Sequence, residues 1–182
     1  MSSPILDVRP LDFQWQTSDP FLFCAFHRDN FPRGNRELGP DASLAGRNIG
    51  QDFELRDGWR MYHGDRIPGF PGHPHRGFET ITIVPHGMVD HADSLGAAGR
   101  YGDGDVQWMT AGSGIIHSEI PEMLEGRMSG FQLWVNLPAK YKMVPPKYQD
   151  IPAANIPEIV SQGCRVRVIR GTYENTTGPA ES

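Results

Sequence analysis

GHPHRGFETITIV, residues Gly72 to Val84, joins two closely spaced histidines to a run of β-branched residues. The run Phe78 to Val84 follows a glycine and has the composition of a β-strand. His73 and His75 are two residues apart, so on an extended chain both imidazoles project to the same side. Pro74 between them cannot donate to a regular ladder, so this segment is expected at an edge, a bulge or a loop end.

Other short runs of the same character predict an all-β protein. They are Pro20 to Phe26, Asp105 to Ala111, Phe131 to Leu137 and Cys164 to Arg170. The 182 residues include 21 Gly and 16 Pro, about a fifth of the chain, which favours many short strands joined by turns over long helices. This length suits one domain of ordinary size, with room for a fragment of a second.

A second pair of candidate ligands lies in GSGIIHSE, residues 112–119. His117 and Glu119 are again two apart and share a face if the segment is extended. If the two segments lie on neighbouring strands, three imidazoles and one carboxylate converge, a donor set that suits Fe(II), Mn, Co, Ni, Cu or Zn. Four protein ligands would leave open positions on a six-coordinate ion. Taken alone, the motifs also allow histidines that are solvated or simply buried in the core.

Composition narrows the classes of function. The formal charge is −5, with 17 basic and 22 acidic residues, so nothing indicates direct nucleic-acid binding. The N-terminus has no basic and apolar secretory pattern, and no stretch is long enough for a membrane span. Cys24 and Cys164 are too few for a disulfide scaffold. A cytoplasmic location is the expectation.

The strings GFPGHPHRGFETITIV, DHADSLG, GDVQWMTAGSGIIHSEIP and FQLWVNLPAKYKMVPPKYQ resemble the pirin family of the cupin superfamily. This resemblance implies a cupin fold, a jelly-roll-like β-barrel, with one metal ion, usually iron and here expected as Fe(II). The implied ligands are His73, His75, His117 and Glu119. Glu79 is the competing carboxylate, because many other cupins place their ligand four residues after the second histidine. His86 and His91 are expected to be surface or hydrogen-bonded histidines.

The resemblance also divides the chain. Residues 1–145 are expected to form the metal-binding cupin domain, with a loop insertion around residues 28–50 that either folds over one face of the barrel or stays a mobile surface loop. Residues 146–182 are expected to be a linker and the first strand of a second cupin domain, truncated here or completed by a partner chain. Self-association through this incomplete part is therefore expected.

The implied activity is that of a quercetin 2,3-dioxygenase, which uses O₂ on flavonol-like substrates, with Glu119 as base as well as ligand. Phe70, Trp108 and Met109 are candidate walls of the substrate pocket, although plain core packing also suits Trp108. The alternative is a non-catalytic, redox-sensitive regulatory protein that binds partner proteins through its metal state. A purely structural metal site is disfavoured because such sites tend to be coordinatively closed.

Overall fold

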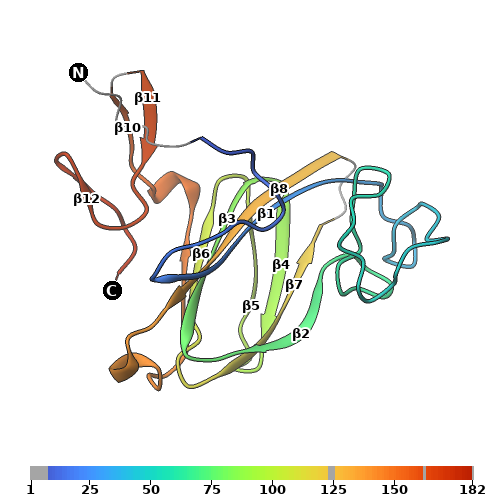
Figure 1. Ribbon diagram of the computed structural model, residues 1–182, viewed down its shortest axis with the longest axis horizontal. Coiled ribbons are helices and arrows are strands. Elements are labelled where there is room, and N and C mark those ends of the chain that lie inside the picture. The colour runs from blue at the N-terminus through green and yellow to red at the C-terminus, as the bar shows by residue number, and fades with distance from the viewer. Residues whose placement is uncertain (1–7, 123–125, 162, 182) are drawn as a thin grey trace.

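The computed structural model describes residues 8–122, 126–161 and 163–181 and consists almost entirely of β-strands. Two antiparallel sheets face each other to form a flattened barrel (Figure 1). The all-β prediction is confirmed. Among the described residues, no helix has the length and apolar character needed to cross a membrane.

The larger sheet has five strands in the order β1-β8-β3-β6-β9. Their bounds are β1 Phe21–Phe31, β8 Gly126–Asn136, β3 Phe78–His86, β6 Val106–Thr110 and β9 Lys147–Ile151. The first four coincide with the β-rich runs of the sequence. β1 continues to Phe31, so the loop that follows begins at Pro32 rather than at Arg28. Polar residues on an exposed strand face make this end resemble a loop in sequence.

The smaller sheet has four strands in the order β2-β7-β4-β5. Their bounds are β2 Phe70–His75, β7 Ile115–Pro121, β4 Met88–Asp93 and β5 Ala98–Gly102. The chain passes from the larger sheet to the smaller at Gly87, between β3 and β4. Gly87 has a left-handed φ of 87°, and a Cβ there would lie 3.2 Å from Met128. Only glycine meets both demands at this corner.

The outer face of the larger sheet is covered by the C-terminal part of the chain. Ile81 and Trp108, which are cross-strand partners, pack there against Ile151, Ile156 and Ala180. The covering segment contains β10 Glu158–Ser161, β11 Cys164–Arg167, β12 Thr172–Tyr173 and β13 Thr176–Thr177, with the 3₁₀ turns η1 Ala139–Tyr141 and η2 Ala153–Asn155 before them. β9 pairs with β6 beyond the expected boundary at residue 145. The division into two domains stays a prediction.

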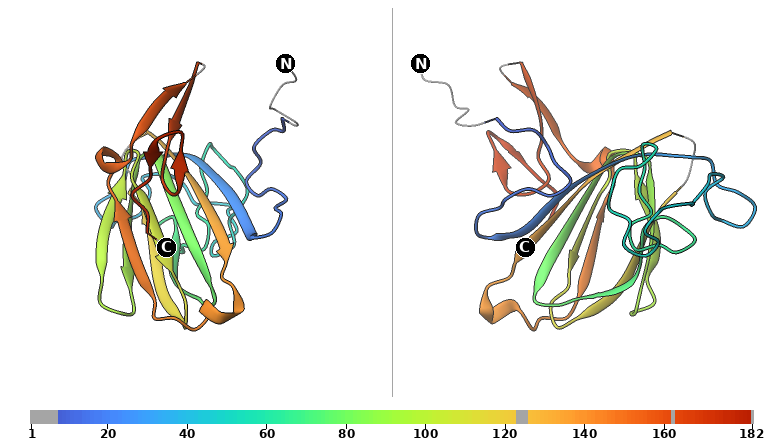
Figure 2. Two further views of the ribbon diagram at one scale, coloured as in Figure 1. Left: turned by 90° about the vertical axis from the view of Figure 1, so that its left-hand side faces the viewer. Right: turned by 45° about the vertical axis from the view of Figure 1, so that its right-hand side comes forward.

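Residues 32–69, called here the 32–69 loop, run from β1 to β2 without a named strand or helix. Figure 2 shows the loop gathered at one end of the barrel. Trp59, Met61 and Tyr62 are buried in a cluster that also includes Phe31 at the end of β1. This cluster makes the loop a packed cap on the barrel end and disfavours the alternative of a mobile surface loop.

A buried ion pair holds the 32–69 loop together. Arg47 Nη1 lies 2.8 Å from Asp52 Oδ2, and the two side chains are 0% and 5% exposed. The guanidinium also lies 3.6 Å from the centroid of Trp59, a cation–π contact. Asp52 Oδ2 further accepts the backbone N–H of Met61 at 3.0 Å. One carboxylate therefore neutralises the cation and fixes the chain just before Tyr62.

Replacement of this carboxylate should loosen the cap. Asp52→Ala leaves a buried guanidinium without its counter-charge, so we expect a loss of about 3 kcal/mol in the free energy of unfolding. Urea denaturation measures the change. Glu158→Ala, which breaks the exposed pair with Arg165, is the control and should cost less than about 1 kcal/mol. Equal losses in the two variants would contradict a special role for the buried pair.

Candidate metal centre

The side chains of three histidines converge on one point beside two paired strands of the smaller sheet. His73 and His75 lie on β2, and His117 lies on β7, where it pairs with His73. Each offers a ring nitrogen, and these nitrogens all lie within 4.8 Å of one another. β2 is an edge strand whose register shifts between Phe70 and His73, which agrees with the irregularity expected from Pro74.

The ring nitrogens of this cluster have the surroundings of metal ligands. His75 and His117 are 4% and 2% exposed. His75 Nε2 and both ring nitrogens of His117 are buried without a hydrogen-bond partner among the described residues, a costly arrangement that a bound cation would relieve. His73 Nδ1 lies 2.9 Å from the carbonyl oxygen of Pro71, and a donor there leaves Nε2 with a free lone pair. The residues present therefore fit a metal ion.

The imidazoles of His75 and His117 are also in the protonation state that a metal requires. Burial, then the neighbouring His117 and His73, lowers the pKa of His75 to about 3. Burial likewise lowers the pKa of His117, with Glu119 acting in the opposite direction. Both rings are neutral at pH 7, and neutral imidazole is the form that binds metals.

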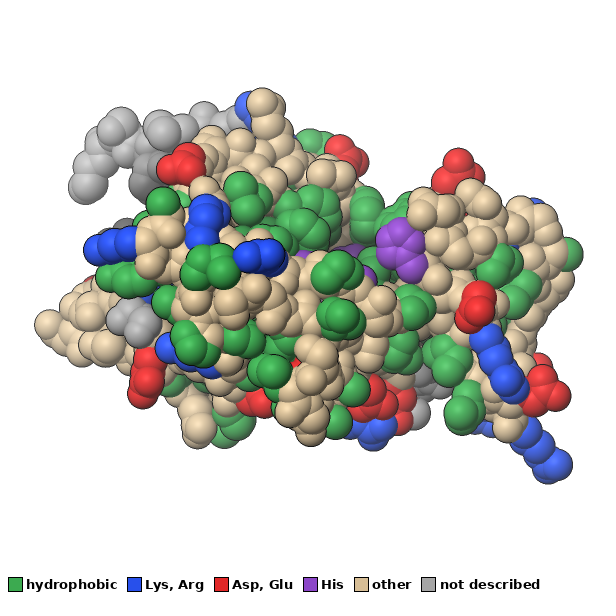
Figure 3. Space-filling model, turned by 90° about the horizontal axis from the view of Figure 1, so that it is seen from below, with side chains coloured by type: hydrophobic (Ala, Val, Ile, Leu, Met, Phe, Trp, Pro, Cys, Tyr) green, Lys and Arg blue, Asp and Glu red, His purple; other side chains and the backbone are tan. Residues whose placement is uncertain are grey.

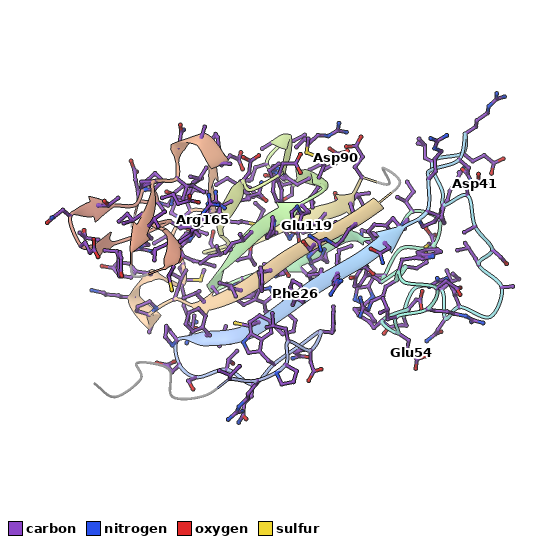
Figure 4. The ribbon with its side chains drawn as sticks, turned by 90° about the horizontal axis from the view of Figure 1, so that it is seen from above. Phe26, Asp41, Glu54, Asp90, Glu119 and Arg165 are labelled. Atoms are coloured by element: carbon purple, nitrogen blue, oxygen red, sulfur yellow. The ribbon has the colours of Figure 1, made fainter. Side chains whose placement is uncertain are left out.

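Glu119 lies two residues after His117 on β7 and is buried between the two sheets (Figure 4). Its Oε1 accepts hydrogen bonds from Tyr101 at 3.1 Å and Thr82 at 3.3 Å, and its Oε2 accepts one from Gln132 at 2.8 Å. Oε2 also lies 3.7 Å from His117 Nε2. Burial raises the pKa of Glu119, but His117 and the hydrogen bond from Gln132 outweigh it and hold this pKa below its usual range. The carboxylate is therefore ionised beside the histidines.

The other titratable candidates lie elsewhere. Glu79 accepts a hydrogen bond from Thr110 at 2.7 Å. Glu79 is three residues from Thr82 on β3, so their side chains point to opposite faces of the sheet. Since Thr82 bonds to Glu119, Glu79 faces away from it. His86 is exposed at the end of the same strand, whereas His91 is buried and lies 3.0 Å from Gln107 through its Nδ1. None of the three belongs to the histidine cluster.

A pocket adjoins Glu119 and is called here the Glu119 pocket. Its lining is mostly aromatic and aliphatic, and consists of His27, Phe31, Tyr62, Phe70, Thr82, Val89, Glu119, Pro121, Met128, Gly130 and Gln132. Glu119 thus borders both the pocket and the histidines. On the face seen from below, histidine side chains lie among hydrophobic ones (Figure 3).

The three residues expected in the pocket wall have different positions. Phe70 lines the pocket. Trp108 lies on the outer face of the larger sheet, where Arg170 stacks over it at 5.0 Å from the ring centroid. Met109 is buried in a separate cluster with Ala111 and Ile115. Trp108 and Met109 are therefore not pocket residues in this fold.

Sequence reasoning missed several polar residues around Glu119, namely His27, Tyr62, Thr82, Tyr101 and Gln132. The signal for His27 is the alternation on β1, where Ala25, His27 and Asp29 share the inner face. Burial lowers the pKa of His27 to about 4, with Glu119 raising it and Arg60 lowering it further. No spacing in the sequence indicates Tyr62, because it lies in the 32–69 loop.

Comparison with known proteins gives a consistent result. The family described as Pirin matches residues 8–135. A relative from Pseudomonas aeruginosa, provisionally named a quercetin 2,3-dioxygenase, is 53% identical over 112 residues, 61% of this chain and 39% of the relative. A pirin-like protein of Caulobacter vibrioides is 53% identical over 117 residues, 63% of this chain and 42% of the relative. The chain spans about two fifths of the length of these curated relatives.

A solved structure shares the fold. The crystal structure of a quercetin 2,3-dioxygenase from Acinetobacter baumannii has a TM-score of 0.67 and 36% sequence identity. The match covers 90% of this chain and 49% of that chain. The likeness therefore extends well beyond the histidine motifs.

Loss of one histidine should weaken metal binding. We expect His75→Ala to lower the affinity for a divalent metal by more than the roughly 10–100-fold that loss of an outer hydrogen-bond partner costs, because a ligand itself is removed. Metal analysis after dialysis and the metal-induced rise in melting temperature measure it. His86→Ala, at an exposed histidine, should bind like the parent. Full metal content in His75→Ala would reject this cluster as the binding site.

Acid should destabilise the metal-free protein. His27 and His75 have folded pKa values of about 4 and about 3, below the ordinary value of 6.5. Between about pH 6.5 and pH 4 the unfolded chain therefore binds protons that the folded chain does not, so the free energy of unfolding falls as the pH falls. Urea midpoints at pH 7 and pH 5 measure the decline. His27→Phe removes one such group and should make the decline shallower; an unchanged decline would contradict the buried neutral ring.

Proposed function

The chain belongs to the pirin family, and on that premise we propose that it is a metal-dependent oxygenase of the quercetin 2,3-dioxygenase type. The proposed ligands of one divalent ion, expected to be Fe(II), are His73, His75, His117 and Glu119. The convergence of three ring nitrogens within 4.8 Å supports the three histidines. Glu119 is supported by its position 3.7 Å from His117 and by its ionised state.

The observation that carries the proposal is that Glu119 borders both the histidine cluster and a pocket fit for an organic ligand. The lining of this pocket is mostly apolar, with a few polar groups, as is usual for small-molecule sites. Phe31, Tyr62 and Phe70 supply aromatic surface that suits a flat, ring-containing substrate. A flavonol-like compound has this shape and also carries hydroxyl groups for the polar side chains at the pocket floor.

The chain's own residues have definite tasks in such a reaction. A bound metal ion would lower the pKa of a substrate hydroxyl and hold the electron-rich ring near O₂. Glu119 is the proposed base, because its carboxylate is ionised and borders the pocket. Gln132 donates to Glu119 and receives a hydrogen bond from Trp134 Nε1 at 3.2 Å, so its amide is fixed with the NH₂ group toward the carboxylate. Apolar walls exclude water from the reacting atoms.

A regulatory role is the second proposal. Leu95, Ile116 and Met143 are 61%, 52% and 60% exposed. They lie on segments beside the histidines: Ile116 next to His117, Leu95 on the turn that bonds to Ile116, and Met143 against Arg76. Exposed apolar side chains of this kind suit a protein partner, or a second copy of the chain, that senses the state of the metal.

Oxygen consumption tests the enzymatic proposal. We expect iron-loaded protein to consume O₂ when quercetin is added, and Glu119→Gln to reduce the rate roughly 100-fold or more through loss of the base and a ligand. An oxygen electrode measures the rate, and metal analysis of each sample separates loss of metal from loss of chemistry.

The exposed-surface variant Ile116→Ser serves as the control and should keep the parental rate, because Ile116 faces solvent rather than the pocket. Absence of O₂ uptake with iron, manganese, cobalt, nickel and copper in turn would count against the oxygenase and favour the regulatory role.

A further inference from the structure

His27 lies in the wall of the Glu119 pocket and has no role in the metal centre. It is on the inner face of β1, and its cross-strand partner on β8 is Gly130. Because Gly130 has no side chain, the residue directly opposite on β8 does not cover the imidazole. Both residues line the pocket, so one edge of the His27 ring is open to a ligand.

A chain of hydrogen bonds fixes which nitrogen of His27 carries the proton. The Tyr62 hydroxyl donates to Asp29 Oδ2 at 2.5 Å, and Asp29 Oδ1 lies 3.3 Å from Arg60. His27 Nδ1 lies 3.0 Å from the same Tyr62 oxygen. Since Tyr62 has given its hydrogen to Asp29, its oxygen must accept from Nδ1–H. Nε2 is then the nitrogen with the free lone pair.

Nε2 of His27 is therefore a hydrogen-bond acceptor that is free to bind a donor group of a ligand. Within the described part of the chain, no side chain or backbone group is hydrogen-bonded to it. The lowered pKa of this histidine, caused first by burial, keeps the ring neutral at pH 7 and the lone pair available. An acceptor in a pocket wall loses free energy when a bound ligand covers it with a group that cannot donate to it.

The ring is also held in one orientation. Phe13 and Phe70 contact it edge-on, with centroids 5.2 and 5.8 Å away. Tyr62 has a left-handed φ of 56°, a conformation that aromatic residues rarely adopt. Two backbone hydrogen bonds with Asp52, at 2.8 and 2.9 Å, hold Tyr62 there. Strain kept in place by surrounding structure often marks a functional position.

We propose that His27 is a specificity-determining residue that accepts a hydrogen bond from a phenolic hydroxyl of the ligand in the Glu119 pocket. Tyr62 and Asp29 are positioning residues that set its tautomer. The identity of the ligand class rests on the proposed function. A site built to bond a hydroxyl discriminates against analogues that lack it, because its own polar group is then left unpaired.

Equilibrium binding to zinc-loaded protein tests this role without turnover, since zinc has no redox chemistry. The probes are quercetin and 3-hydroxyflavone, which keeps the hydroxyl beside the carbonyl but lacks the other four. The parent should prefer quercetin. His27→Phe keeps an aromatic ring in contact with Phe13 and Phe70. It should lower the affinity for quercetin roughly 10-fold and leave the affinity for 3-hydroxyflavone unchanged.

Two further variants make the result specific. Tyr62→Phe removes only the hydroxyl that sets the tautomer, and should also reduce the preference for quercetin, which a purely structural residue would not do. It replaces His27→Phe as the decisive variant if the latter does not fold. His86→Phe, at an exposed histidine on β3, should keep the parental preference.

Undiminished preference for quercetin in His27→Phe and Tyr62→Phe would overturn the proposal, as would failure of the parent to bind either probe. A lost preference in both variants would support it even if the iron-loaded protein consumed no O₂. In that case the oxygenase proposal alone would fail, and the pocket would remain a phenol-binding site.

Discussion

The architecture depends on one buried carboxylate. Glu119 keeps its negative charge between two sheets, and a charge in such a place must be compensated by donors from every side. Thr82 donates to it from β3, Tyr101 from β5 and Gln132 from β8. Because these donors belong to both sheets, the charge is fully hydrogen-bonded only when the two sheets have packed together.

Glu119 also separates two environments with different chemistry. On one side, the imidazoles of His73, His75 and His117 form a compact, nitrogen-rich cluster. On the other side lies the mainly apolar Glu119 pocket. The cluster lies on β2 and β7 of the smaller sheet, whereas the pocket wall draws on strands of both sheets and on Tyr62 from the 32–69 loop. The histidine cluster and the pocket therefore share β2 and β7, and Glu119 belongs to the surroundings of both.

The histidine cluster could be predicted from the sequence because it follows the two-residue repeat of a strand. His73 with His75, and His117 with Glu119, needed only extended backbone to share a face. Trp108 was harder to place, because both faces of β6 are buried and alternation with Met109 does not reveal which face is inner. The position of Tyr62 could not be inferred at all. It depends on contacts between residues distant in sequence, with Asp52 and Asp29 above all, and no local repeat encodes them.

The 32–69 loop begins and ends in one hydrophobic cluster, since Phe31 on β1 and Phe70 on β2 both pack there. Its internal fold relies on Arg47, Asp52 and Trp59, which are all its own residues. The loop is also tied to β1, because Tyr62 and Arg60 both contact Asp29. Because Tyr62 also lines the Glu119 pocket, a change in this loop would reshape the pocket wall while β2 and β7, which carry the histidines, keep their pairing.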